Sequence, residues 1–346
     1  MAVKTVCWFG FYDTTYSRNR VLLAGFRELG WEVVECQIKP KTVGRFLKYW
    51  QLILIYWRQC RGVKFDLVVV AFPGHIVMPL AYLLFGEQII FDAFVSLYNS
   101  EIEDRQEYAP HSLRAFYYYS LDRLTCRLAK KVLLDTEAHI DYFVNTFKLP
   151  ASKFIRVFVS TTPDLFYPIE TKPSAKFIVH FHGSNIPLQG MAVIIEAARQ
   201  LVVSQPEIIF RLIGPFANLK VPINIELYAP VSLKKLNELL NEADVVLGIF
   251  GGTKKAQLVI PNKVFEGLAV AKPVITGETE AVQELLSDKQ NVILCRVNDS
   301  VALAGEIVAT KNNHNKSKLV AKNGYKLFKD RLLPVEIVSD LLCQLT

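Results

Sequence analysis

Short apolar runs alternate with amphipathic stretches along almost the whole chain. The apolar runs have the composition of strands at residues 4–9, 32–36, 66–72, 88–91, 131–134, 154–159, 176–183, 208–214, 223–229, 243–250, 272–276 and 291–295. Helical spacing lies between them, for example at 17–30, 110–129, 136–147, 189–203, 232–242 and 263–270. Continuous apolar strands separated by helices are typical of a parallel sheet with helices on both faces. The pattern therefore predicts an α/β chain.

The alternation is interrupted once, by a stretch rich in proline and polar residues near 163–176. We therefore predict two doubly wound, Rossmann-like domains in tandem, 1–168 and 174–332. Helical spacing predicts one helix from residue 314 to the end of the chain. The last part of this helix, 333–346, could cross back to the first domain. Ligands of such sheets bind at the carboxyl ends of the strands, so we expect these ends to face a central cleft.

The longest apolar stretch, residues 67–86, approaches the length of a membrane-spanning helix. Pro73, Gly74 and Pro79 interrupt it, which favours a strand, a turn and a helix. The N-terminus has no signal-peptide pattern, and the six cysteines form no CxxC pair. We expect a cytoplasmic protein with reduced thiols, and neither a zinc ribbon nor a disulfide scaffold.

Composition and charge narrow the classes further. Hydrophobic residues make up 51% of the chain and charged residues 21%, which excludes wholesale disorder. The net charge is +7, and residues 39–64 alone carry seven cations and no acid. This argues against nucleic-acid binding through a broad basic face and for one local anionic contact.

A helix predicted over 45–61 has aromatic side chains within one arc and cations mostly opposite. This is the pattern of a helix lying in a membrane interface. The simpler alternative is that the aromatic face packs on the sheet, and both hold if the helix is half buried. Peripheral contact with an anionic inner membrane face is the hypothesis, with these interface candidates: Arg45, Lys48, Trp50, Trp57, Arg58 and Arg61.

Several familiar motifs are missing from the chain. It has no GxGxxG, GxxxxGK[ST], HExxH or GxSxG string and no D-x-D pair. These absences weigh against a dinucleotide oxidoreductase, a P-loop kinase, a zincin, a serine hydrolase and a transferase that holds its donor through a D-x-D-bound metal.

The segment 261–276, PNKVFEGLAVAKPVIT, predicts a helix followed by a strand. Pro261 suits the first helical turn, and Lys263 and Glu266 share a face. A helix N-terminus attracts an anion, and a carboxylate accepts two hydrogen bonds from the diol of a ribose. The simpler alternative is an exposed ion pair between the two side chains. His182, at the end of a predicted strand, is either a core residue or part of a site.

Residues 176–312 resemble the donor domain of retaining GT-B glycosyltransferases, family four or group 1. The resemblance rests on strings in the same order: FHGSNIPLQG, IEAARQL, FRLIG, LYAPVSLKKLNELLNEADVVLGIF and PNKVFEGLAVAKPVIT. Its IPLQG and IPNKVFE strings resemble one branch of that family. The resemblance implies a GT-B fold and these donor-side residues: Gly10, Gly183, Gln189, Gly214, Val231, Asn262, Lys263, Glu266 and Glu284. In it, Glu266 would bind the ribose, and Gly214 and Val231 would border the base.

The sequence departs from the family pattern at the diphosphate. The first of the paired glutamates is Leu258, and the usual basic pair is replaced by Ser184 and Gln189. A buried diphosphate needs a cation, for which the candidates are Lys263, Arg18, Lys254 and Lys255. The first half fits the resemblance less tightly. Its acceptor-side candidates are Asp92, Asp104, Arg105 and His139, although an internal Asp104–Arg105 pair is an equal alternative.

The resemblance implies a glycosyltransferase that moves a sugar from a nucleotide-sugar to a glycan or a polyprenyl-diphosphate-linked acceptor in cell-surface glycoconjugate synthesis. Configuration would be retained, without a metal or other cofactor. No single catalytic base stands out. The alternatives are a non-catalytic GT-B subunit that binds carbohydrate or a partner, and a sugar-nucleotide epimerase.

Overall fold

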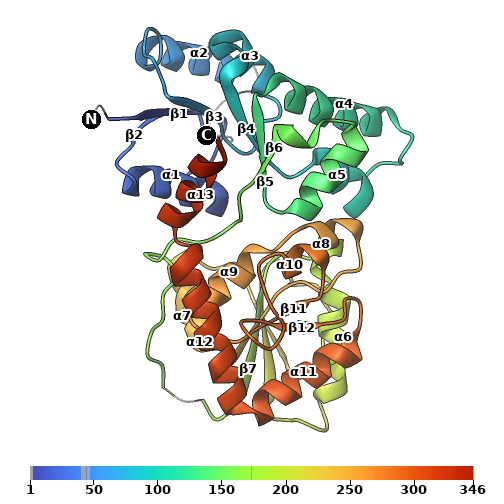
Figure 1. The fold of residues 1–346 in the computed structure, drawn as a ribbon. Helices are drawn as coiled ribbons and strands as arrows, with labels where there is room; N and C mark the ends of the chain where they lie inside the picture. The colour runs from blue at the N-terminus through green and yellow to red at the C-terminus, as the bar shows by residue number, and fades with distance from the viewer. Residues whose placement is uncertain (1–2, 40–43, 45–46, 173, 346) are drawn as a thin grey trace. The chain divides into compact units, whose positions relative to one another are not determined.

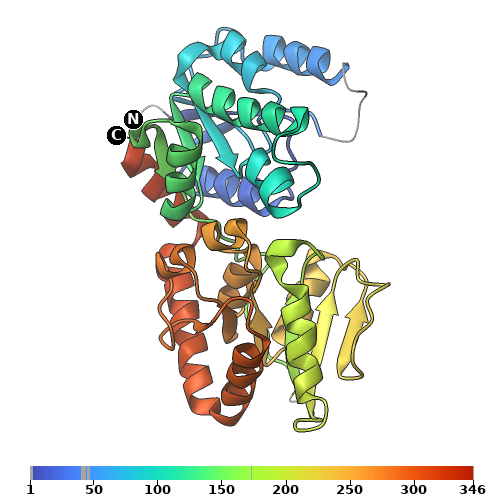
Figure 2. The same cartoon turned by 90° about the vertical axis from the view of Figure 1, so that its right-hand side faces the viewer.

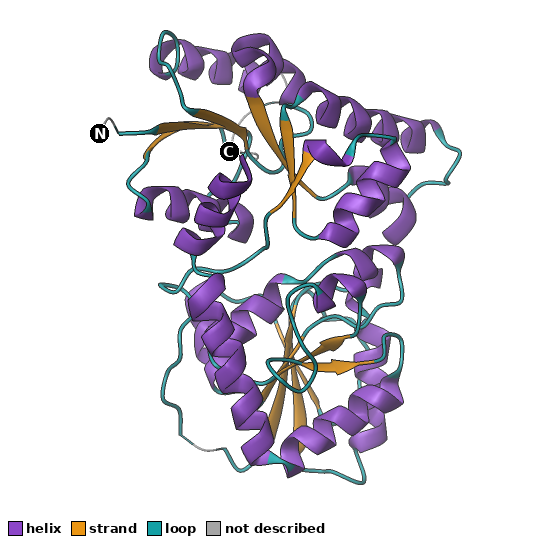
Figure 3. Ribbon diagram, in the orientation of Figure 1, coloured by secondary structure: helices purple, strands orange, loops and turns teal. Residues whose placement is uncertain are grey.

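The computed structural model describes residues 3–39, 44, 47–172 and 174–345 (Figure 1). The chain forms two compact units, residues 1–160 with 333–346, and residues 161–332. Each unit is built around its own parallel, six-stranded sheet with helices packed on it (Figure 3). The predicted α/β class with two doubly wound domains is confirmed, and the architecture is that of the GT-B fold.

The first unit has its strands in the order β2 (Glu32–Gln37), β1 (Thr5–Gly10), β3 (Leu67–Val70), β4 (Ile89–Phe94), β5 (Lys131–Leu134) and β6 (Phe154–Arg156). Its helices are α1 (Ser17–Glu28), α2 (Leu47–Gln59), α3 (Met78–Phe85), α4 (Leu113–Leu128), α5 (Glu137–Phe147) and α13 (Pro334–Leu345). The inner strands β1, β3, β4 and β5 are buried on both faces, as β4 shows along its whole length, which explains their mostly apolar sequence, whereas the edge strand β2 is half-buried.

The second unit has the strand order β12 (Ile293–Cys295), β11 (Val274–Gly277), β10 (Val245–Leu247), β7 (Phe177–His182), β8 (Ile208–Ile213) and β9 (Ile225–Tyr228). Its helices are α6 (Met191–Leu201), α7 (Leu233–Asn241), α8 (Lys254–Leu258), α9 (Asn262–Ala269), α10 (Glu280–Gln283), α11 (Ser300–Asn312) and α12 (His314–Arg331). In Figure 2, α6 is yellow-green and α11 and α12 are red; α6 packs against α11, and α9 against α12.

The strand order locates the point at which each sheet is able to bind a ligand. In the second unit the chain runs from β7 to β8 and β9 on one side, and then returns to β10 on the other. Doubly wound sheets bind ligands beyond the carboxyl ends of the strands where the order reverses. In this unit that point is the carboxyl end of β7, at His182 and Gly183.

The predicted continuous helix from 314 onward is wrong. α12 ends at Arg331, and Pro334 begins α13, because proline has no N–H and its ring blocks helix continuation. α13 belongs to the first unit, where it lies so close to α1 that a Cβ on Gly25 would collide with the Pro334 carbonyl.

The apolar stretch at 67–86 forms β3, a turn and α3, as predicted. Among the described residues, no helix combines the length and the apolar character needed to cross a bilayer.

Candidate functional site

A buried polar cluster lies where β7 meets the start of α9. β7 ends at His182, and Gly183 follows with a φ of +154°. A Cβ on Gly183 would lie 3.1 Å from Lys263 Nζ and 3.2 Å from Gln189 Oε1. Gly183 therefore leaves the room in which Lys263 and Gln189 meet. We call Gly183, His182, Gln189, Lys263 and Glu266 the β7–α9 cluster.

Glu266 is fixed by histidines and not by the neighbouring lysine. Its Oε2 lies 2.6 Å from Nε2 of His182, whose Nδ1 lies 3.2 Å from Nε2 of His180. If His182 donates its Nε2–H to the carboxylate, its Nδ1 accepts from His180. The pKa of His180 is lowered well below its usual value, mainly because the side chain is buried, so His180 is neutral. Among the described residues, no group hydrogen-bonds the other oxygen of Glu266, Oε1.

Lys263 is a buried amine without a carboxylate partner among the described residues. Its ammonium hydrogen-bonds Oε1 of Gln189 and lies 4.2 Å from the centre of the Phe181 ring. Burial lowers the pKa of Lys263 to about 7, although the charge of Glu266 opposes the shift. Because the amine sits near its titration point, an incoming anion would favour the charged form. The alternative of an exposed Lys263–Glu266 ion pair is wrong, since both side chains are buried and each has a different partner.

The loop that carries Gln189 is braced by the strand end next to it. Residues Pro187–Gln189 form one 3-10 turn, and Gly190 follows with a φ of +69°. The N–H of Phe250 donates to the carbonyl of Gln189, and a Cβ on Gly190 would collide with the backbone at 250–251. The backbone beyond β10 thus fixes the position from which Gln189 reaches Lys263.

The start of α9 adds backbone donors to the cluster. Pro261 is the N-cap, and among the described residues no side chain caps this end. The first N–H groups of a helix lack intrahelical acceptors and carry the positive end of the helix dipole. Asn262, the first residue of α9, is half-buried here.

Three other residues predicted for the donor side lie at the ends of neighbouring elements. Gly214 follows β8 and packs behind the turn, because a Cβ on it would collide with the carbonyl of Gly183. Val231 precedes α7, and Glu284 directly follows α10; both are half-buried. The roles of Val231 and Glu284 stay predictions.

Sequence reasoning left His182 open and did not consider His180 at all. The one available signal was the place of His182 at a strand end beside Gly183. Its pairing with Glu266, 84 positions away, follows only from β7 and α9 becoming neighbours.

In the first unit, Arg18 and Asp92 neutralise each other. Nε and Nη2 of Arg18 lie 3.0 and 2.9 Å from Oδ1 of Asp92, and both side chains are almost completely buried. Arg18 Nη1 also donates to the carbonyl of Val157. The pair ties α1 to β4 and to the chain after β6. A structural role is therefore better supported for both than the phosphate and acceptor contacts expected from the sequence.

The other acceptor-side candidates also have partners within the first unit. Nδ1 of His139 lies 2.7 Å from Oδ1 of Asp135, and both residues are buried. Arg105 pairs with Glu101 at 2.5 Å, which supports the structural alternative for Arg105, although its partner is Glu101 and not Asp104. Glu101 lies on the π-helical segment Asn99–Asp104, and Arg105 directly follows that segment, four positions after Glu101.

Gly10 has a structural use in the first unit. A Cβ there would lie 3.3 Å from Cγ1 of Val77, and the φ of Gly10 is +139°. Among the described residues, no group of three His, Cys, Asp or Glu side chains is placed to hold a metal ion.

α2 is half buried: some of its aromatic side chains pack on the fold, and others are exposed. Tyr49 and Tyr56 face the fold and donate to the carbonyls of Ile76 and Leu84, at 3.2 and 3.1 Å. Trp50 and Trp57 are exposed. Lys48 lies over the ring of Phe11, and Arg61 over that of Trp57, so these two cations contact aromatic side chains. Arg45 lies outside the described residues.

Residues 176–313 match the family model described as glycosyl transferases group 1. No curated protein sequence matches the chain. Among solved structures, sucrose-phosphate synthase from Thermosynechococcus elongatus is similar with a TM-score of 0.72 at 13% identity, covering 99% of each chain. Anabaena HepE in complex with UDP-glucose gives 0.68 at 14% identity, covering 99% of this chain and 98% of HepE. A Rickettsia africae glycosyltransferase gives the same values.

Proposed function

We propose that this glycosyltransferase binds a nucleotide-sugar at the β7–α9 cluster and transfers the sugar with retention of configuration. One observation carries the proposal: a buried amine and a buried carboxylate meet at the carboxyl end of β7, and each is held by a different side chain, Gln189 for Lys263 and His182 for Glu266. The family match over the same residues supports it. The similarity in fold to Anabaena HepE, which was solved in complex with UDP-glucose, supports it as well.

In this proposal Glu266 binds the ribose of the donor. His182 holds Oε2, which leaves Oε1 and the remaining lone pairs to accept from two vicinal hydroxyls. A carboxylate that is already fixed loses little conformational entropy on binding. Its hydrogen bonds to a ligand are therefore less costly than those of a mobile side chain.

Lys263 and the first N–H groups of α9 bind the diphosphate. The basic pair that is usual in the family is missing after β7. In this proposal the amine of Lys263, which reaches from α9 to Gln189 and Gly183, takes the place of that cation. Positive charge from the amine and the helix end stabilises the leaving diphosphate, and the proposal requires no metal.

The transfer step follows from retention of configuration. The acceptor hydroxyl attacks the anomeric carbon from the face of the departing diphosphate. The bond from carbon to phosphate oxygen breaks as the new glycosidic bond forms, and the acceptor proton moves to a phosphate oxygen. Lys263 stabilises the charge on the diphosphate, so no protein base is required. The acceptor is a glycan or a lipid-linked glycan.

A thermal-shift series with UDP-, GDP-, ADP- and dTDP-sugars tests the donor assignment. A ligand that binds only the folded protein raises the free energy of unfolding, by about 2.7 kcal/mol at a ligand concentration of 100 times Kd. The melting temperature rises with it. We expect one base class to stand out and Glu266→Ala to weaken its binding at least tenfold. Glu238→Ala, on the exposed side of α7, is the matched control. Unchanged binding by Glu266→Ala, or no shift with any donor, would contradict the proposal.

A further inference from the structure

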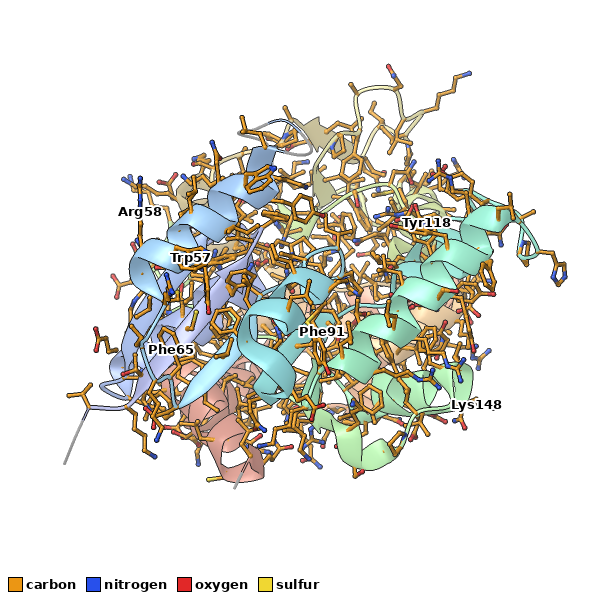
Figure 4. The ribbon with its side chains drawn as sticks, turned by 90° about the horizontal axis from the view of Figure 1, so that it is seen from above. Trp57, Arg58, Phe65, Phe91, Tyr118 and Lys148 are labelled. Atoms are coloured by element: carbon orange, nitrogen blue, oxygen red, sulfur yellow. The ribbon has the colours of Figure 1, made fainter. Side chains whose placement is uncertain are left out.

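Exposed apolar side chains gather on the face of the first unit that α2, α3 and α4 form together. Figure 4 looks onto this face and labels Trp57, Arg58 and Tyr118 on it. On α2, the exposed residues are three or four positions apart and therefore on one side of the helix: Leu47, Trp50, Leu54 and Trp57. The charge pattern of the sequence pointed only to this helix.

α3 and α4 extend the apolar surface beyond α2. Leu83 on α3 is 81% exposed. α4 also has an exposed apolar stripe at helical spacing, and its first residue is 89% exposed: Leu113, Phe116, Tyr117 and Leu124. Large apolar side chains exposed on three adjacent helices are uncommon in a soluble surface without a partner. We call the surface of these three helices the three-helix face.

The charge of the three-helix face has one sign. α2, α3 and α4 contain a single carboxylate, Asp122, and it is completely buried. Four cations on or next to these helices have no carboxylate within ion-pair distance among the described residues: Lys48, Arg58, Arg61 and Arg114. The face therefore offers cations that a partner must neutralise, next to apolar side chains that a partner must cover.

An open pocket lies within the face, between α2 and α4. Its volume is about 590 Å³, and it is lined by Lys48, Tyr49, Ile76, Leu113, Arg114 and Tyr117. Two cations at an apolar wall fit a phosphate that carries an apolar chain. Lys48 already lies 4.5 Å from the centre of the Phe11 ring, so its charge is held at the pocket.

We propose that the three-helix face docks on an anionic lipid bilayer, with the phosphate of one lipid headgroup in the pocket between α2 and α4. Tryptophan and tyrosine prefer the headgroup region, and long basic side chains extend from it to lipid phosphates. A protein partner would have to bring an acidic surface and an apolar surface to the same face, whereas anionic headgroups above an apolar bilayer supply both together. The docking suits the proposed lipid-linked acceptor but does not depend on donor binding.

Co-sedimentation with lipid vesicles tests the proposal without any sugar donor. We expect the protein to bind vesicles of phosphatidylcholine with phosphatidylglycerol at least tenfold more tightly than vesicles of phosphatidylcholine alone, since each cation near an anionic surface contributes about a factor of five. Leu113→Ser/Phe116→Ser on α4 should weaken binding to both kinds of vesicle. Lys48→Glu/Arg114→Glu should remove most of the preference for anionic lipid.

Matched changes in the second unit control for general surface effects. Val203→Ser/Ile223→Ser removes two equally exposed apolar side chains, and Lys326→Glu/Lys329→Glu reverses two exposed charges. Both should bind vesicles like the unmodified protein. All variants should keep the thermal shift with the donor, which separates a failure of docking from a failure of the proposed function. Unchanged vesicle binding by the α4 variant, or equal binding to neutral and anionic vesicles, would overturn the proposal.

Discussion

Both units are doubly wound parallel sheets with different strand orders, and their buried cations have different partners. In the first unit, Arg18 and Asp92 place a full positive charge against a full negative one. In the second, the carboxylate of Glu266 is held by the imidazole of His182, and the amine of Lys263 by the neutral amide of Gln189. A closed ion pair leaves little net charge for a ligand, whereas an ammonium group held by a neutral amide keeps its charge.

The comparison shows that a doubly wound sheet does not by itself decide the chemistry at its strand ends. Both sheets are doubly wound and both place polar residues near strand ends. At its strand ends, the second unit keeps a buried amine, Lys263, that no carboxylate within ion-pair distance neutralises among the described residues. A buried pair costs desolvation once and is compensated internally, but a buried unpaired charge stays costly until something binds it. In the proposed function, an anionic, hydroxyl-bearing ligand would offset the desolvation cost of the charges that the second unit keeps buried.

Breaking the closed pair should give the largest effect. We expect Arg18→Ala to lower the free energy of unfolding by about 3–5 kcal/mol, because it leaves Asp92 buried and uncompensated. Urea denaturation measures the loss. Arg27→Ala removes a guanidinium from an exposed pair with Glu35 and should cost about 1 kcal/mol or less. Similar losses for the two variants would mean that the Arg18–Asp92 pair is not the buried, closed pair described above.

Removing the amine of the second unit should have the opposite effect on stability. Lys263→Met should leave the free energy of unfolding unchanged or raise it, because a desolvated amine is replaced by an apolar chain. It should weaken donor binding by about tenfold to a hundredfold, the usual range for a charge-assisted contact. Calorimetric titration with the preferred nucleotide-sugar measures the change. Lys234→Met on α7 is the exposed control, and a large loss of stability in Lys263→Met would break the contrast between the units.

The histidine that orients Glu266 should have a smaller effect. We expect His182→Leu to weaken donor binding by about twofold to tenfold, the range of one ordinary hydrogen bond, because His182 acts on the donor only through Glu266. His182→Gln should recover most of this, because its amide N–H is able to donate to the same carboxylate. The loss should disappear for a 2′,3′-dideoxy nucleotide, which lacks the hydroxyls. An equal loss with that ligand would assign His182 a merely structural role.

The smallest expected effect is on pH dependence. The pKa of Lys263 is lowered to about 7, and a bound diphosphate favours its charged form. Donor affinity should thus be highest below pH 7 and fall as pH rises through this value, by at most tenfold per pH unit. Titrations between pH 6 and pH 8 measure the slope. Lys263→Met should flatten it, and a slope that persists in this variant would assign the titration to another group.

Much of the architecture was predictable from local sequence. Every described strand lies within a predicted apolar run or extends beyond it by at most three residues, because a strand covered on both faces needs an uninterrupted apolar sequence. α9 begins within one residue of its predicted start, since Pro261 fixes the first turn. The short helices α8 and α10 were not predicted, because helices of four or five residues leave no periodic pattern.

The candidate site was predictable in part. Lys263, Glu266, Gly183 and Gln189 were singled out from the sequence, and the structure brings these four together. Their partners were not predictable, because local spacing suggested that Lys263 and Glu266 pair with each other. The first-unit candidates were chosen as polar residues after apolar strands, and sequence gives no sign that such residues neutralise one another.

The sequence by itself determined the strands, most helices, the position of the glycine turn and the charge of the segment around α2. These depend on residues close together in the chain, whose spacing decides which side is buried. Only the tertiary structure decided that His182 meets Glu266, that Arg18 meets Asp92, and that α4 continues the apolar surface of α2. Such contacts depend on which strands and helices become neighbours, and a side chain takes its electrostatic character from the atoms packed around it.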